Sequence, residues 1–226
     1  MTDATLRQAL AYAARGWPVF PCQPGQKIPA TRHGYRDATT DEQQIAAWFG
    51  GHEDLNLAIA TGTPGPGVLD IDQHGSAGNG FAELNRLRAA GMLDGASAWV
   101  RTPSGGLHAY FTGSHQRNGH LPGHHLDFRS AGGYVLAPPS AVARKPYQLL
   151  HETGGRGGLD WDTVTRLLHP STSASTTSSS GRHSRSPPVM TSATWPAGSP
   201  ASPKVTVMRA CPGPPTARGR PTPLPT

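Results

Sequence analysis

Cysteine is nearly absent from this chain of 226 residues, which contains only Cys22 and Cys211. Two cysteines so far apart exclude a disulfide framework and a zinc site built on CxxC pairs, and their scarcity favours a cytoplasmic setting. No apolar run approaches the roughly 20 residues that span a bilayer. The first residues include an early carboxylate and lack an apolar segment, so we expect neither a secretory signal nor a membrane location.

Apolar and charged residues are also scarce, at 35% and 15% of the chain, whereas 28 glycines and 23 prolines make up more than a fifth of it. The formal net charge of +6 is typical of a nucleic-acid-binding protein, but it is distributed unevenly. Residues 1–169 contain 14 Lys+Arg and 14 Asp+Glu, whereas residues 170–226 contain 6 Lys+Arg and no carboxylate. The positive surplus therefore belongs to the C-terminal segment.

Residues 170–226 hold 12 of the 23 prolines together with many serines and threonines. Such a segment buries too little apolar surface to offset the entropy of ordering it, so we expect a disordered basic tail. A DNA-attracting arm, a linker and a frameshifted reading frame all stay open as explanations. The tail follows one expected catalytic domain at residues 1–169.

Within residues 1–169 the apolar spacing predicts both helices and strands, in an α+β domain. Leu6, Leu10 and Ala13 recur at helical spacing before Gly16, and residues 40–43 have the spacing of a capping box ahead of a second helix. The other expected elements are helices at 81–90 and 160–168 and strands at 17–20, 57–60, 68–72, 98–102, 107–112, 126–129, 134–137 and 147–150.

Asp70 and Asp72 flank Ile71 in an apolar stretch. Alternate side chains of a strand project to the same face, so the two carboxylates are expected to lie together. Adjacent carboxylates repel each other unless a cation lies between them, and Mg²⁺ and Mn²⁺ prefer such oxygen ligands. The plainer interpretation, with both acids solvated at a strand end, stays open for this motif alone.

A second motif combines a glycine turn with a histidine. Ser104, Gly105 and Gly106 connect two expected strands, and a turn of this kind exposes backbone N–H groups that can bind an anion. His108 follows two residues later, within reach of a triphosphate. A plain hairpin with a core histidine also produces this pattern.

A third motif places Asp127 and Arg129 on one face of an expected strand, ahead of a Gly-Gly-Tyr segment at residues 132–134. A carboxylate suits a metal ion and a neighbouring guanidinium suits a phosphate. A surface ion pair that contributes little is the alternative.

The order of these motifs resembles the bifunctional DNA primase/polymerase (prim-pol) domain of the archaeo-eukaryotic primase superfamily. The N-terminal pieces agree: A-x-x-Y-A-x-x-G at residues 9–16, W-P-V-F-P at 17–21, G-x-K-x-P at 25–29 and N-L-A-I-A-T-G at 56–62. The resemblance implies a primase-polymerase fold, with an RRM-like antiparallel or mixed sheet flanked by helices.

The resemblance also implies a two-metal nucleotidyl transferase, a DNA primase/polymerase that acts in replication of a plasmid, phage or integrated element. Its expected partners are a DNA template and primer and a dNTP or NTP. Three carboxylates are expected to hold two Mg²⁺ or Mn²⁺ ions: Asp70, Asp72 and Asp127. His108 is expected to join them as a catalytic residue that contacts the substrate phosphates. Further nucleotide contacts are expected from the glycine turn and two cations: Ser104, Gly105, Gly106, Arg129 and Lys27.

Two other functions stay open: a D-x-D nucleotide-sugar transferase, which also uses Mn²⁺, and a catalytically degenerate DNA-binding replication module. The first gives no account of the turn before His108. In the second, the carboxylates would repel DNA phosphates in the absence of metals.

Four histidines gather in one expected loop: His115, His120, His124 and His125. Because no cysteine or carboxylate stands beside them at ligand spacing, the sequence disfavours zinc. No Walker A sequence is present, so a separate replicative helicase is a further candidate partner.

Overall fold

The computed structural model describes residues 4–52 and 54–169. Over these residues the chain has the mixed α+β fold that the sequence predicts. The expected disordered tail at 170–226 lies outside the described residues, and the division into two regions at residue 169 stays a prediction. Within the described part, no helix is long and apolar enough to cross a membrane.

The described chain contains four α-helices and three short 3-10 helices. The helices are α1 (Ala4–Ala14), η1 (Gly34–Asp37), α2 (Glu42–Phe49), η2 (Gly75–Ala77), α3 (Phe81–Ala89), η3 (Pro122–His124) and α4 (Trp161–Leu168). The strands are β1 (Val19–Cys22), β2 (Asn56–Thr61), β3 (Gly67–Ile71), β4 (Ala98–Arg101), β5 (Leu107–Phe111), β6 (Gly119–Leu121), β7 (Leu126–Arg129), β8 (Gly133–Leu136), β9 (Ala141–Val142), β10 (Lys145–Pro146) and β11 (Gln148–Glu152).

These strands form one large sheet and two small ones. The large sheet has the order β11-β4-β5-β3-β7-β6, a three-stranded sheet has the order β1-β2-β8, and β9 and β10 form a hairpin. The paired strands are all antiparallel. Of the antiparallel and mixed sheets that the resemblance allowed, the structure has the antiparallel one.

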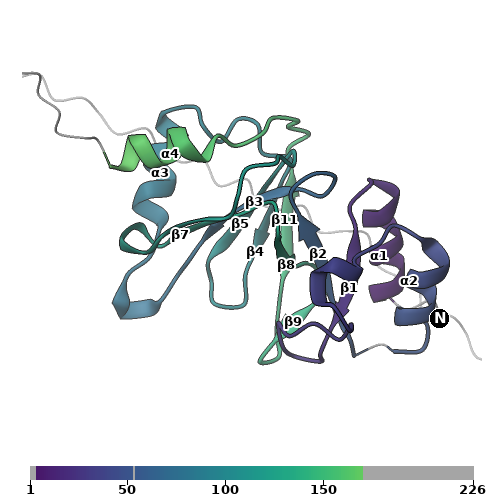
Figure 1. Cartoon of the computed structure of the whole chain (residues 1–226). Coiled ribbons are helices and arrows are strands. Elements are labelled where there is room, and N and C mark those ends of the chain that lie inside the picture. Colours follow the sequence, from purple (N-terminus) through teal and green to yellow (C-terminus); the bar gives the residue numbers. More distant parts are fainter. Residues whose placement is uncertain (1–3, 53, 170–226) are drawn as a thin grey trace, which may run out of the picture. The chain divides into compact units, whose positions relative to one another are not determined.

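One face of the large sheet packs against α3 and α4, which lie together at one end of the ribbon in Figure 1. Leu84 and Leu87 of α3 and Val164 and Leu168 of α4 are buried in this layer. The sheet contributes alternate residues of its strands to the same cluster: Leu69, Ile71, Ala109, Phe111, Leu126 and Phe128. The guanidinium of Arg86 also donates to the Leu167 carbonyl, at 3.2 Å.

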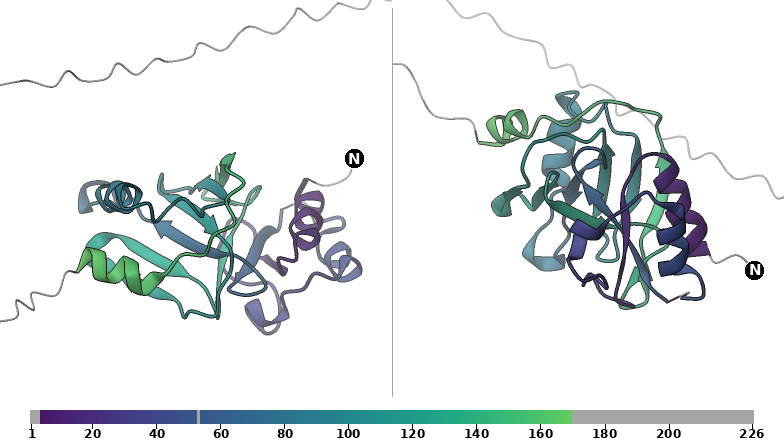
Figure 2. Two further views of the ribbon diagram at one scale, coloured as in Figure 1. Left: turned by 90° about the horizontal axis from the view of Figure 1, so that it is seen from above. Right: turned by 45° about the vertical axis from the view of Figure 1, so that its right-hand side comes forward.

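A second apolar cluster joins α1, α2 and the three-stranded sheet, which lie together away from α3 and α4 in both views of Figure 2. On α1 the buried residues are Thr5, Ala9, Tyr12 and Ala13. The Leu6 and Leu10 side chains, which the sequence placed at the centre of this face, are only partly buried at its margin.

Local chemistry explains one shifted boundary. Helix α2 is capped by Asp41, whose carboxylate accepts from the N–H groups of Gln43 and Gln44. The capping-box spacing instead pointed to Thr40. A carboxylate is a strong cap because its negative charge also interacts favourably with the positive N-terminal end of the helix dipole.

Candidate active site

Four strands of the large sheet each place one residue in a single row. Asp70 of β3 is paired in register with Asp127 of β7 on one side and with His108 of β5 on the other. His120 of β6 stands opposite Asp127 and completes the row. Because directly opposed residues in antiparallel strands project to one face, these side chains share the face away from α3 and α4. The structure thus brings together three residues that the sequence predicts for the site.

His108 is buried at the end of this row, next to Asp70. Its Nε2 lies 3.4 Å from Oδ1 of Asp70, and its Nδ1 has no hydrogen-bond partner among the described residues. Burial acts to raise the pKa of Asp70, but the His108 contact together with the charges of Lys27 and Arg129 outweighs burial, so the pKa lies below its ordinary value. Asp70 is therefore an anion at neutral pH, and Nδ1 of His108 is a buried nitrogen whose hydrogen-bonding capacity is unused among the described residues.

Asp127 is held by a histidine and an arginine. Its Oδ1 contacts Nδ1 of His120, and its Oδ2 accepts from the Arg129 guanidinium. The Asp127 side chain is 9% exposed, whereas those of Arg129 and His120 are 41% and 65% exposed. The carboxylate is therefore the fixed member of this group, and the side chains bound to it have access to solvent.

Asp72 follows the last residue of β3, so it lies outside the strand in which the sequence placed it. Its N–H donates to the His125 carbonyl at 3.0 Å, and its Oδ2 lies 3.8 Å from Nε2 of His74. Its pKa is raised, first by burial and then by the charges of Asp70 and Asp127. The three carboxylates are thus close enough to repel one another.

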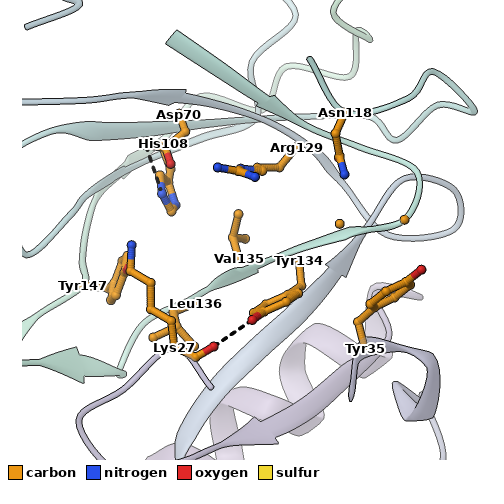
Figure 3. Close-up of a pocket in the computed structure, with 12 residues that line it drawn as sticks. Lys27, Tyr35, Asp70, His108, Asn118, Arg129, Tyr134, Val135, Leu136 and Tyr147 are labelled. Carbon is orange, nitrogen blue, oxygen red and sulfur yellow. Dashed lines mark hydrogen bonds and ion pairs between the residues drawn. The ribbon is translucent and has the colours of Figure 1, made fainter. Parts of the chain in front are cut away.

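Two cavities open onto Asp70 and His108 of this row. The larger one, of about 340 Å³, lies between the large sheet and β8, with Arg129 and Tyr134 on facing walls in Figure 3. The smaller one, of about 270 Å³, reaches Asp72 and Ser104. Four residues line both cavities: Lys27, Asp70, His108 and Tyr147.

The glycine turn brings Ser104 to the smaller cavity, where its hydroxyl lies 3.0 Å from that of Thr102. The N–H of Gly105 is used inside the turn, donating to the Thr102 carbonyl at 2.9 Å. A Cβ on Gly106 would lie 2.3 Å from the Ile71 carbonyl oxygen, so glycine lets the turn pack against β3. Neither glycine lines the two cavities, and their role in phosphate binding stays a prediction.

Lys27 reaches both cavities from the loop between β1 and η1, across from Asp70 in Figure 3. Its carbonyl accepts from the Tyr134 hydroxyl at 2.8 Å. Within the loop, the N–H of Gln23 donates to the Ile28 carbonyl at 2.8 Å. These bonds fix the backbone that presents the lysine.

A comparison with protein families agrees with this geometry. The family model Prim-Pol, described as bifunctional DNA primase/polymerase, N-terminal, matches residues 9–167. The chain belongs to the Prim-Pol family. This confirms the resemblance drawn from the motifs, and the family is one of DNA primase/polymerase-type nucleotidyl transferases, which bind DNA and nucleotides. A search of curated proteins returned no match.

In this Prim-Pol domain the four histidines of the expected loop have separate surroundings. His115 is exposed, His124 Nδ1 lies 3.2 Å from Oε1 of Glu83, and the His125 ring centroid lies 5.5 Å from that of His74. The fourth histidine is the one that contacts Asp127. Among the described residues, no group of three or more His, Cys, Asp or Glu side chains is arranged to hold a metal ion.

Sequence reasoning missed residues that reach the Prim-Pol cavities from distant segments. The Tyr147 ring centroid lies 5.6 Å from that of His108, and burial raises the pKa of this tyrosine. The other missed lining residues are Tyr35, Asn118, Tyr134 and Lys145. Tyr134 belongs to the Gly-Gly-Tyr motif and was the only one with a local signal.

Proposed function

We propose that this Prim-Pol chain is a metal-dependent nucleotidyl transferase that adds nucleotides to a DNA primer. The observation that carries the proposal is the row of Asp127, Asp70 and His108, in which Asp70 and His108 line both cavities and Asp127 is the cross-strand neighbour of Asp70. Carboxylates, a histidine that lines both cavities and two nearby cations suit a site for a metal-bound triphosphate.

Asp70, Asp72 and Asp127 are the proposed ligands of two Mg²⁺ or Mn²⁺ ions. They supply the oxygen donors that these ions prefer, and their mutual repulsion is relieved by a bound cation. Binding an ion would require these side chains to rearrange, because Asp127 is bound to His120 and Arg129. Held by these carboxylates, two such ions would supply activation of the primer 3′-hydroxyl and charge stabilisation for the leaving pyrophosphate.

The remaining site residues are proposed to bind and orient the triphosphate. His108 and Ser104 face it from the large sheet and the glycine turn, and Lys27 neutralises phosphate charge from the opposite wall. Arg129 adds a guanidinium that can bind two phosphate oxygens at once. Their contribution to the rate is positioning and charge neutralisation.

The test is extension of a labelled primer on a DNA template by the full chain, with dNTPs or NTPs and Mg²⁺ or Mn²⁺, against the same reaction in EDTA. We expect extension only with a divalent ion. Turnover of a nucleotide sugar without extension would instead favour the D-x-D transferase, and DNA binding with no turnover would favour the degenerate module.

The biological setting is also part of the proposal. We place the chain in replication of a plasmid, phage or integrated element, with a separate replicative helicase as partner. Extension needs a primer that is already present, whereas de novo priming starts a new strand without one. Supplying the template without a primer separates the two.

A further inference from the structure

Both carboxylate oxygens of Asp127 are already engaged. His120 contacts Oδ1 and Arg129 donates to Oδ2, while only 9% of the Asp127 side chain is exposed. A carboxylate in this state is neutralised by the protein itself. A divalent ion could reach it only beside these two contacts, on the lone pairs that they leave free.

The same carboxylate is the cross-strand neighbour of Asp70, which places it beside the proposed metal ligands. A guanidinium on Asp127 puts a positive charge where a divalent ion would have to approach. At such short range like charges oppose each other strongly in a partly buried site. Metal binding and the contact between Arg129 and Asp127 therefore compete.

Arg129 is also placed to bind a triphosphate in the larger cavity. Its side chain is 41% exposed and lines the larger cavity, together with Lys27. In Figure 3 its guanidinium projects over the cavity near His108. A triphosphate in this cavity offers oxygens that a guanidinium binds in pairs, with more charge than one carboxylate.

We infer that Arg129 is an exchange residue, which holds Asp127 in the empty site and moves to the substrate triphosphate when the nucleotide binds. This inference rests on the proposed function. The exchange frees Asp127 for a divalent ion only when the nucleotide is present. Since coupling between two ligands is reciprocal, each one strengthens the binding of the other through Arg129.

The exchange makes a prediction that needs no metal. In EDTA, Asp127→Asn weakens the hold on Arg129 and so tightens binding of dATP, by about fivefold. The matched control is Asp72→Asn, which removes a carboxylate of the same site that has no contact with Arg129. We expect less than about a twofold change in this control.

A second experiment tests the same coupling from the metal side. It measures Mn²⁺ binding without nucleotide, by the electron paramagnetic resonance signal of free Mn²⁺. Arg129→Gln is expected to tighten Mn²⁺ binding by about tenfold, although it removes a phosphate contact. Lys27→Gln removes a nearby positive charge that does not contact Asp127, and we expect a smaller gain. Circular dichroism confirms that each variant is folded.

The exchange is overturned if Asp127→Asn gains no more dATP affinity than Asp72→Asn. It is also overturned if Arg129→Gln gains no more Mn²⁺ affinity than Lys27→Gln. Primer extension by the wild-type chain is measured in parallel. If the wild type extends primers and the paired variants behave alike, the exchange alone is wrong. If the wild type neither extends primers nor binds dATP or Mn²⁺, the proposed function fails with it.

Discussion

The two faces of the large sheet are built by the same strands, but only one of them carries the polar row, beside apolar residues such as Val68 and Tyr110. In β3, Leu69 and Ile71 are fully buried beneath the α3 and α4 layer, whereas Asp70 between them faces the cavities. In β7, Phe128 is buried in that layer, whereas Asp127 lies in the polar row. Because side chains alternate along a strand, residues that stabilise the core are adjacent in sequence to residues of the site.

This separation has a physical basis. The apolar face gains free energy from area removed from water, which does not depend on ionic conditions. The polar face concentrates carboxylates that repel one another, at a cost which the apolar face offsets. Substitutions on the two faces should therefore have different consequences, even between adjacent residues.

The largest expected effect is on the polar face. Asp127→Asn keeps the shape of the side chain but removes a proposed metal ligand, so we expect primer extension to fall by about 10³-fold or more. The assay is single-nucleotide incorporation at saturating Mn²⁺, with circular dichroism as the control for folding. Retention of more than a tenth of the wild-type rate would contradict the role given to this carboxylate.

The next effect is on the apolar face. Leu69→Ala leaves a cavity in a fully buried layer, and we expect the free energy of unfolding to fall by about 3 kcal/mol. Urea denaturation measures this loss. The incorporation rate per folded molecule should stay near that of the wild type, and a rate loss as large as that of Asp127→Asn would break the distinction between the faces.

A smaller effect is expected away from both faces. Asp41→Ala removes the cap of α2 and should lower the free energy of unfolding by about 1 kcal/mol. Nucleotide affinity should not change, because α2 does not line either cavity. Thermal unfolding and a KM measurement on one preparation test both statements. Asp41→Asn is the matched control, since asparagine also caps helices.

The smallest effect concerns the wall of the larger cavity that Tyr134 and Lys27 form, opposite the polar row. Tyr134→Phe removes the hydrogen bond to the Lys27 carbonyl and should cost about 0.5 kcal/mol of stability. Because the loop that presents Lys27 loosens, we expect KM for the nucleotide to rise by about twofold with kcat unchanged. An unchanged KM would mean that the loop does not depend on this bond.

The sequence predicted most where a pattern is local. Strand β7 has the predicted bounds, and β3 and β5 fall within the strands predicted at 68–72 and 107–112 apart from Gly67; their pairing, which the sequence did not show, brings Asp70, His108 and Asp127 into one row. Asp72 is an exception, because β3 ends before it. Alternation predicts which face a residue takes but not where pairing stops.

What the sequence could not predict depends on contacts between distant segments. Strand β6 has three residues and no apolar alternation, yet it brings His120 to Asp127. Tyr147 reaches His108 across the sheet, and Lys145 reaches the smaller cavity from a two-residue strand. Short polar strands take their places from neighbours in the sheet rather than from their own residues.

The most direct test of the account uses Asp70, the centre of the row. The measurement is the rate of single-nucleotide incorporation by Asp70→Asn, per folded molecule, beside the wild-type chain with Mg²⁺ or Mn²⁺. The account predicts folded protein and a rate at least about 10³-fold lower. A folded Asp70→Asn variant that extends primers at the wild-type rate would contradict it.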